Sequence, residues 1–171
     1  MKAIWKRIHT WLDANAPEGH GHLRPGASAE AIQAAEKALG LKLPADVKAS
    51  YRIHDGQSNE PGLIGDEGWY LLSLRKMVMD WRAWSRSDPD YAYRVPVAWG
   101  GAGDLVFLDL GPDSEKPGRL MVQRRDRAEP DPVAPSFRFW LEDFADKLDD
   151  GELAYSEEDG CIMYADEVDL E

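Results

Sequence analysis

The sequence contains little cysteine and no long hydrophobic run. Cys161 is the single cysteine among 171 residues, so no disulfide can form within the chain, and disulfides are the main mark of an oxidising compartment. No stretch approaches the roughly 18 consecutive apolar residues that suggest a membrane span. We therefore expect one domain with one hydrophobic core, in the reducing cytoplasm and not bound to a membrane.

The first residues also lack the features of a secretory signal. Ala14-Asn15-Ala16 matches the small-residue pattern of a cleavage site, but charged residues and a histidine interrupt the apolar core that a signal peptide needs. The apolar residues instead recur at three-four spacing, which predicts an amphipathic helix. They are Ile4, Trp5, Ile8, Trp11 and Leu12.

Motifs for nucleotide binding and nucleophilic catalysis are missing too. The chain contains neither Gly-Lys followed by Ser or Thr, which a Walker loop requires, nor G-x-S-x-G. The acidic residues near Cys161 are expected to raise its thiol pKa, which disfavours a nucleophile. His54 and Asp55 adjoin, but no nucleophile is spaced to join them in a relay. We therefore predict a protein that is not an enzyme, with no catalytic residue and no cofactor.

The glycine-rich stretch VAWGGAGDLVFLDL, residues 97–110, bears on this prediction. A dinucleotide-binding loop needs G-x-G-x-x-G between a strand and a helix. Here Val106 occupies the third glycine position, and the residues that follow are strand-like. We therefore predict a tight or bulged turn between two strands, in which Asp104 accepts hydrogen bonds from nearby amides.

Two patterns resemble metal sites without completing one. His20 and His22 lie in a glycine-rich loop with no third ligand in view. Residues 146–157 follow part of an EF-hand pattern, but Leu148 stands where a ligand oxygen is required. We predict no metal site.

Capping residues and hydrophobic spacing predict four further helices. Their expected starts are Ser28, Pro44, Ser73 and Ser136, and their expected stops include Gly40, Asp55-Gly56 and Gly151. The segment WYLLSL and three later runs, RVPVAW, LVFLDL and RLMVQRRD, read as strands. No helix is available to cross over between the last three, so they predict an antiparallel meander. The fold class is therefore α+β, with a mainly antiparallel or mixed sheet packed against several helices.

The formal net charge of −12 is concentrated at the carboxyl end. Between Glu142 and Glu171 there are 13 acidic residues and one lysine, whereas 19 acidic and 19 basic residues balance in the rest. This charge repels nucleic acid and anionic membranes and attracts a basic protein. The arginines at positions 119, 124, 125 and 127 do not overcome it. The alternative is an acidic tail that serves only solubility.

The order of motifs resembles the SUKH superfamily over about residues 5–148. The likeness is most specific in A-E-x-x-L-G-x-x-L-P-x-D from Ala35 to Asp46, in the turn His54-Asp55-Gly56, and in Gly103-Asp104 before the Leu108-Asp109 strand. The superfamily includes a fungal cell-wall assembly regulator and many bacterial immunity proteins. The resemblance implies an α+β fold and, for bacterial members, a non-enzymatic role: binding and blocking a toxin, often a nuclease or deaminase. It assigns no binding residue in this chain.

These observations give one leading hypothesis. We divide the chain into a SUKH-like domain at 1–151 and an acidic segment at 152–171, packed on the same domain, because Ile162, Met163 and Tyr164 indicate that this segment folds back. The leading hypothesis is an immunity protein that binds a basic toxin through acidic side chains. These are Asp149, Asp150, Glu152, Glu157, Glu158 and Asp159.

Two alternatives remain at this point. One is a regulatory scaffold that binds endogenous proteins, as in the control of cell-wall synthesis. The other is a small-ligand sensor with an aromatic pocket, although large aromatic residues more often fill a core. The residues of this predicted pocket are Trp69, Trp81, Trp84, Trp99 and Asp104.

Overall fold

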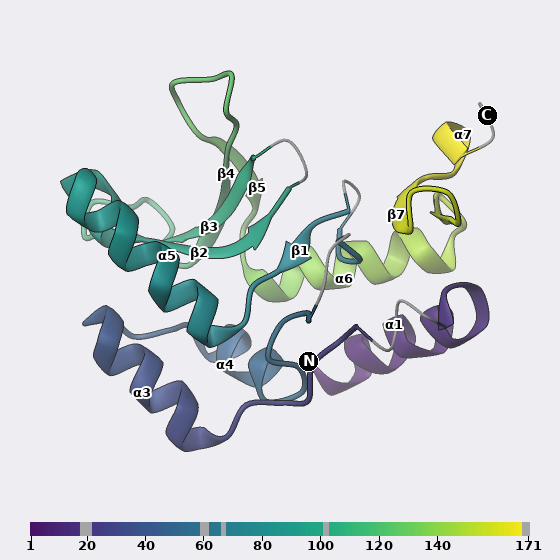
Figure 1. The fold of residues 1–171 in the computed structure, drawn as a ribbon, viewed down its shortest axis with the longest axis horizontal. Coiled ribbons are helices and arrows are strands. Elements are labelled where there is room, and N and C mark those ends of the chain that lie inside the picture. Colours follow the sequence, from purple (N-terminus) through teal and green to yellow (C-terminus); the bar gives the residue numbers. More distant parts are fainter. Residues whose placement is uncertain (18–21, 59–61, 66–67, 101–102, 169–171) are drawn as a thin grey trace.

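The computed structural model describes residues 1–17, 22–58, 62–65, 68–100 and 103–168 (Figure 1). The fold combines helices with an antiparallel sheet, so the predicted α+β class is confirmed. The helices are α1 (Lys2–Asn15), α3 (Ala29–Leu39), α4 (Ala45–Tyr51), α5 (Leu74–Ser87), α6 (Phe137–Asp149) and the short α7 (Ala165–Val168), and a 3-10 helix, η1 (Pro89–Tyr93), follows α5.

The main sheet has five strands in chain order: β1 (Tyr70–Leu71), β2 (Arg94–Trp99), β3 (Leu105–Asp109), β4 (Arg119–Gln123) and β5 (Asp131–Ala134). Every neighbouring pair is antiparallel, which confirms the predicted meander and excludes the mixed arrangement. The sequence did not predict β5, because Pro132 interrupts the strand pattern. Proline is tolerated here since β5 lies at the edge of the sheet, where a missing N–H leaves no partner unpaired.

The glycine-rich segment joins β2 to β3, as predicted. The Gly100 amide donates to the Asp104 carbonyl at 2.8 Å, and Gly103 has φ of 85°, which glycine adopts without strain. The register between the two strands shifts between Pro96 and Ala98, so the hairpin is bulged. A strand follows the glycines, and this geometry excludes a phosphate-binding loop at a helix start.

The predicted helix caps are confirmed. The hydroxyl oxygens of Ser28, Ser73 and Ser136 accept hydrogen bonds from the first-turn amides of α3, α5 and α6 at 3.1, 3.3 and 3.1 Å. Gly40 and Gly151 take the left-handed conformation after α3 and α6. Helix α4 is shorter than predicted, because the chain beyond Tyr51 pairs with residues 25–27 instead of continuing the helix.

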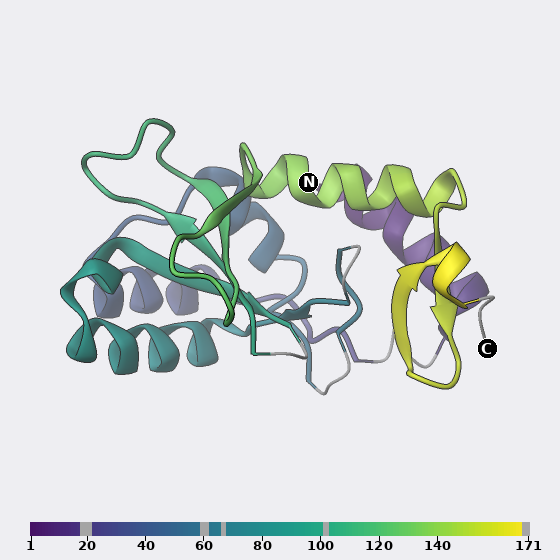
Figure 2. The same cartoon turned by 90° about the horizontal axis from the view of Figure 1, so that it is seen from above.

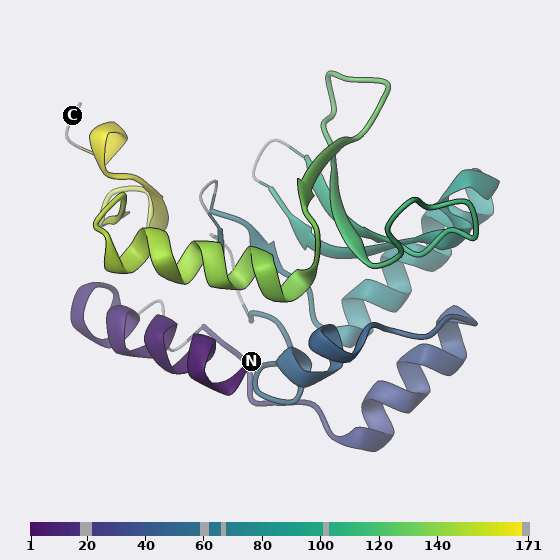
Figure 3. The same ribbon diagram turned by 180° about the vertical axis from the view of Figure 1, so that it is seen from behind.

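One main core joins the helices to one face of the sheet. Helix α1 lies beside α6 (Figure 3), and Trp5 is 1% exposed, with its indole N–H donating to the Ser50 hydroxyl at 2.9 Å. Alternate residues of the strands point into this core, as a pleated strand requires. These residues are Val95, Val97, Val106, Leu108, Leu120 and Val122.

The opposite face of the sheet carries a second, smaller apolar cluster. Leu105, Phe107 and Met121 form it, and the partly buried indoles of Trp84 and Trp99 pack against them. A mainly aromatic cover therefore lies over this face, which places two of the predicted pocket residues together.

The carboxyl end folds back as a two-stranded hairpin, β6 (Leu153–Ser156) with β7 (Cys161–Tyr164). Leu153 and Ile162 of this hairpin are buried in the main core. The division at residues 151 and 152 stays a prediction. Seen from above, the hairpin lies at the opposite end of the molecule from α3 and α5 (Figure 2). Along the described residues, no helix is long and apolar enough to cross a membrane.

Candidate protein-binding surfaces

An aromatic hollow opens on the second face of the sheet. The ring centroids of Trp84 and Trp99 lie 5.4 Å apart, and those of Trp84 and Tyr91 lie 5.9 Å apart. The hollow has a volume of about 350 Å³, and Leu105, Gln123 and Arg125 also line it. Tryptophan, tyrosine and arginine are the residues that most often dominate binding energy at protein interfaces. This composition suits contact with another molecule.

A buried carboxylate fixes one wall of the hollow. The indole N–H of Trp99 donates to Asp80 at 2.9 Å, and Lys76 donates to both oxygens of the same carboxylate at 2.6 and 2.8 Å. Asp80 is 7% exposed, and the Lys76 ammonium lies 5.7 Å from the Trp99 ring centroid. A buried charge needs such partners, so α5 and β2 hold the Trp99 ring in one orientation.

The structure separates the other predicted pocket residues from this hollow. Trp69 is 3% exposed in the main core, where its ring would lie 2.7 Å from a Cβ at Gly100. Trp81 is half-buried, and its indole N–H donates to the Ala92 carbonyl at 3.2 Å. Only Trp84 and Trp99 of the four tryptophans therefore line the hollow, and a ligand there stays a prediction.

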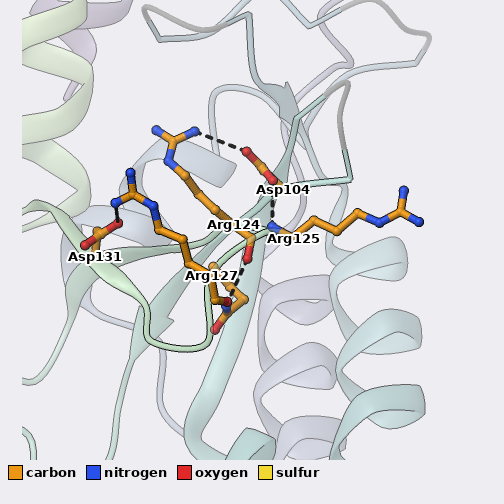
Figure 4. A network of polar contacts seen from close by, with 6 residues as sticks. Asp104, Arg124, Arg125, Arg127 and Asp131 are labelled. Carbon is orange, nitrogen blue, oxygen red and sulfur yellow. Dashed lines mark hydrogen bonds and ion pairs between the residues drawn. The ribbon is translucent and has the colours of Figure 1, made fainter.

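Asp104 binds the loop that follows β4. Its carboxylate accepts the Arg125 amide at 2.9 Å and the Arg124 guanidinium at 3.1 Å (Figure 4). The segment after β4 supplies both donors, and the expectation that Asp104 caps its own turn stays a prediction, because residues 101–102 of that turn lie outside the described residues. The Arg125 side chain points away from Asp104 (Figure 4) and borders the hollow with a positive charge.

The same loop is held by further polar contacts. The Gln123 amide donates to the carbonyls of Arg124 and Arg127 at 3.1 and 2.7 Å, and Arg127 pairs with Asp131 at 2.7 Å (Figure 4). Arg124 and Arg127, two of the four arginines considered for nucleic acid, are thus paired with carboxylates in this loop, and a third, Arg119, pairs with Asp109. The contacts of Arg124 and Arg127 join β4 to β5 and to the turn before β3.

The predicted acidic residues gather at the far end of the molecule. We call Asp149, Asp150, Glu152, Glu157, Glu158 and Asp159 the acidic surface. They lie at the end of α6 and on the β6–β7 hairpin, whose Leu153 packs under them in the main core. All six residues are exposed.

The members of the acidic surface differ in their partners. Asp149 shares the Arg7 guanidinium of α1 with Asp146, at 2.6 and 2.7 Å. The hydrogen bonds that Arg7 donates to Asp146 and Asp149 hold the pKa of Arg7 above its ordinary value. Asp159 accepts the Ser156 hydroxyl at 3.0 Å within the hairpin turn. Within the described part of the chain, the other four carboxylates form no ion pair.

Cys161, His54 and Asp55 each contact neighbouring groups of the fold. Burial, and then the Asp159 carboxylate, raise the pKa of the Cys161 thiol, as the sequence predicted. His54 and Asp55 do not face each other: the His54 Nδ1 lies 2.8 Å from the Arg24 carbonyl, and Asp55 accepts the Leu74 amide at 2.7 Å. Nε2 of His54 contacts Nε2 of His9 at 2.6 Å, a pair that sequence spacing could not reveal.

Metal ligands are not grouped in the described residues. Among these residues, no set of three or more histidine, cysteine, aspartate or glutamate side chains could hold an ion. His20, one of the two loop histidines, lies outside the described residues. Leu148 is 2% exposed and fills the core where the EF-hand pattern would need a ligand.

The charged residues of the resemblance motifs stabilise the fold. Glu36 accepts the Leu43 amide at 3.0 Å beside two lysines, and Asp46 accepts the Arg138 amide at 2.9 Å. Asp55 and Asp104 bind amides as described above, and Asp109 pairs with Arg119 at 3.2 Å. Asp46, Asp55 and Asp104 join segments that are distant in sequence. Glu36 and Asp109 join neighbouring segments.

The comparison with known families agrees with this pattern. The SMI1 / KNR4 family (SUKH-1) matches residues 26–143, which is more than half of the chain. The chain belongs to this family. The SMI1/KNR4 match includes the motif carboxylates, the aromatic hollow and helices α3 and α5, whereas α1 and the acidic surface lie outside it.

Relatives in the SMI1/KNR4 comparison are larger proteins. The chain is 30% identical over 94 residues to the glucan synthesis regulatory protein of Neurospora crassa, covering 53% of this chain and 17% of that protein. It is 35% identical over 86 residues to a KNR4/SMI1 homolog of Yarrowia lipolytica, covering 48% of this chain and 12% of that protein. It is 39% identical over 66 residues to F-box only protein 3 of Homo sapiens, covering 38% of this chain and 14% of that protein. The chain thus spans less than a fifth of each.

Proposed function

We propose that this protein is a non-enzymatic protein-binding module that covers a basic protein partner with its acidic surface. The observation that carries the proposal is a set of exposed carboxylates that form no ion pair with any residue the structure describes: Asp150, Glu152, Glu157 and Glu158. A surface that already satisfied its charges internally would gain little from a basic partner. These four side chains remain available for one.

Electrostatics supports a basic partner over other classes. The formal net charge is −12, and residues 142–171 contribute all of it. Such a surface steers a cationic protein into place and raises its association rate, mainly at low salt. Leu153 and Ile162 bury the hairpin in the main core, and this anchoring supports a specific contact over diffuse attraction.

We further propose that the partner is a basic toxin, so that the protein acts in immunity. The SUKH resemblance supports this role, and many nucleases must be basic to hold phosphate. The acidic surface lies outside residues 26–143, the part matched by the family. This location fits a partner specific to this protein, because a shared partner would need a shared surface.

A regulatory scaffold is the second candidate, and the relatives favour it. One similar protein is named a glucan synthesis regulatory protein and another an F-box protein, and both carry the matched region as a small part of a longer chain. A scaffold would bind proteins of its own cell and inhibit none of them. The two functions therefore differ in the origin of the partner.

A pull-down from the source organism distinguishes these functions. The protein is used as bait against the lysate and the secreted fraction at low and moderate salt, and bound proteins are identified by mass spectrometry. Recovery of one basic secreted effector that is lost as salt rises supports immunity. Recovery of endogenous cytoplasmic proteins alone supports the scaffold and contradicts immunity.

The acidic surface itself is tested with a neutralised variant. The changes Asp150→Asn, Glu152→Gln, Glu157→Gln and Glu158→Gln should slow association with the recovered basic partner by about tenfold at low salt and flatten its salt dependence. Stopped-flow fluorescence measures both quantities. A matched control neutralises four exposed carboxylates elsewhere: Asp90→Asn, Asp113→Asn, Glu115→Gln and Glu129→Gln. Equal rates for the two variants would contradict the proposed surface.

A further inference from the structure

A long groove runs between α3 and α5, far from the acidic surface. The two helices lie side by side at one end of the molecule (Figures 1 and 2). The groove has a volume of about 760 Å³. Its α3 wall is made of small side chains at helical three-four spacing, which places them on one face. They are Ala31, Ala34, Ala35 and Ala38.

The α5 wall combines apolar and basic side chains. Met79 is 54% exposed, and the half-buried Val78 lies next to it in the groove. Arg75, Arg82 and Arg86 also line the groove and are exposed. Met79 and the three arginines share a helix face by their spacing. An exposed methionine beside alanines is a surface that adapts to aliphatic partners.

The arginines have no partner of opposite charge in the described part of the chain. Asp55 is the one acidic residue in the groove lining, and its carboxylate already accepts the Leu74 amide at 2.7 Å at the start of α5. Lys76 and Asp80 form an ion pair within α5. The Asp80 carboxylate of this pair accepts the Trp99 indole N–H, so the pair holds a residue of the aromatic hollow and does not line the groove. The groove therefore presents an apolar floor with a positive edge.

We propose that this groove binds an acidic amphipathic helix of a partner protein. Leucine-like side chains of such a helix would fit against the alanines and Met79, as in other helix-in-groove complexes. Its carboxylates would accept forked hydrogen bonds from Arg75, Arg82 and Arg86. The α5 wall extends over 12 residue steps from Leu74 to Arg86, which at 1.5 Å per residue is about 18 Å, or roughly three helical turns.

The chemistry of the groove favours a protein helix over a nucleic acid. A phosphate backbone needs cations but gains nothing from an apolar floor, and the net charge of −12 repels it. An acidic helix gains from both features. The proposal does not rest on the acidic surface, which lies at the other end of the molecule (Figure 2).

A pair of peptides tests the proposal on the full-length protein. The acidic probe is a fluorescein-labelled peptide of about 16 residues, with leucines at positions i, i+3, i+4 and i+7 and glutamates on the flanking positions. The neutral probe has glutamine in place of every glutamate. By fluorescence anisotropy at low salt, the acidic probe should bind at least about tenfold more tightly, and the difference should narrow as salt rises.

Two variants locate the binding in the groove. The double variant Arg82→Gln with Arg86→Gln should lower the affinity for the acidic probe at least about tenfold and leave the affinity for the neutral probe nearly unchanged. Ala34→Gln, which fills the floor at an exposed helical position, should weaken both probes at least about fivefold. Lys2→Gln with Lys116→Gln removes two exposed lysines elsewhere and should change neither affinity by more than about twofold. Melting temperatures confirm that each variant folds.

Other outcomes overturn the proposal. Equal affinity for the acidic and neutral probes would show that the arginines do not select charge. Unchanged binding by Ala34→Gln would place the probe elsewhere. If sedimentation shows that the chain self-associates and that Ala34→Gln abolishes this, the groove is an interface between copies of the chain and not a site for a partner helix.

Discussion

At the scale of single residues, the motif carboxylates hold segments together. Glu36 is 5% exposed and receives hydrogen bonds from the Leu43 amide and from Lys42 and Lys48. Burial alone would raise the pKa of Glu36, but these three donors outweigh it and hold that pKa below the ordinary value of 4.5. The charged form of Glu36 therefore stabilises the link between α3 and α4.

This shift predicts how Glu36→Gln behaves with pH. Because the folded-state pKa is lowered, the carboxylate stabilises the fold above the unfolded-state pKa and loses this effect as the pH falls through the folded-state pKa. Near neutral pH the variant should lose about 1–3 kcal/mol of unfolding free energy. The difference in unfolding free energy between the variant and the wild type should shrink as the pH falls below 4.5. Urea unfolding at a series of pH values measures this difference.

Glu129→Gln, at an exposed position, serves as the control and should stay within about 0.5 kcal/mol of the wild type. A difference for Glu36→Gln that stays constant into acid would mean that the charge of Glu36 is not what stabilises the link.

At the scale of elements, α6 connects the parts of the molecule. Its first turn is capped twice, by the Ser136 hydroxyl on the Phe139 amide and by Asp46 of α4 on the Arg138 amide. Its apolar face packs in the main core beside α1, and its last turn carries Asp149 of the acidic surface. Stability of α6 therefore also fixes the place of the acidic surface.

Ser136→Ala should cost about 1 kcal/mol of unfolding free energy, because the Phe139 amide loses its acceptor at the helix start. Urea unfolding measures this loss. Ser87→Ala is a suitable comparison, since the Ser87 hydroxyl donates only to carbonyls of its own helix end, and it should change stability by less than about 0.5 kcal/mol. Equal losses for the two serines would argue against the cap.

At the scale of the whole molecule, charge of opposite sign occupies opposite ends. The α3–α5 groove is lined by arginines, and the acidic surface lies at the end of α6 and on the β6–β7 hairpin, at the other end of the molecule (Figures 1 and 2). The separation exceeds the distance over which exposed charges interact strongly in physiological salt, about 8 Å. The two surfaces should therefore bind independently.

A lysine-flanked version of the peptide probe tests this independence. The neutralised acidic-surface variant should bind the lysine-flanked peptide at least about fivefold more weakly than the wild type, and its affinity for the acidic probe should change by no more than about twofold. Arg82→Gln with Arg86→Gln should show the reverse pattern. Coupled changes in both affinities, measured by anisotropy, would indicate one connected surface and contradict two independent sites.

Much of the fold could be predicted because its signals are local. Ser28, Ser73 and Ser136 bond to amides three residues away, and the strand pattern of β2 to β4 repeats every two residues. The edge strand with Pro132 escaped prediction because an edge position, known only from the sheet, makes proline acceptable there. The residues of the predicted pocket were likewise separated by tertiary packing. Trp69 is buried in the main core and Trp81 bonds to the Ala92 carbonyl, whereas Trp84 and Trp99 line the hollow.

The sequence by itself determined the five main helices and the serine caps of three of them, the antiparallel meander and the concentration of negative charge at the carboxyl end, because each depends on neighbouring residues or on counting. Only the tertiary structure decided that Arg7 pairs with Asp149, while the other four carboxylates named above form no ion pair with the described residues. It also decided that α3 and α5 lie together, with alanines and arginines lining the groove between them. Distances between residues far apart in the chain depend on how the elements pack, which no local pattern specifies.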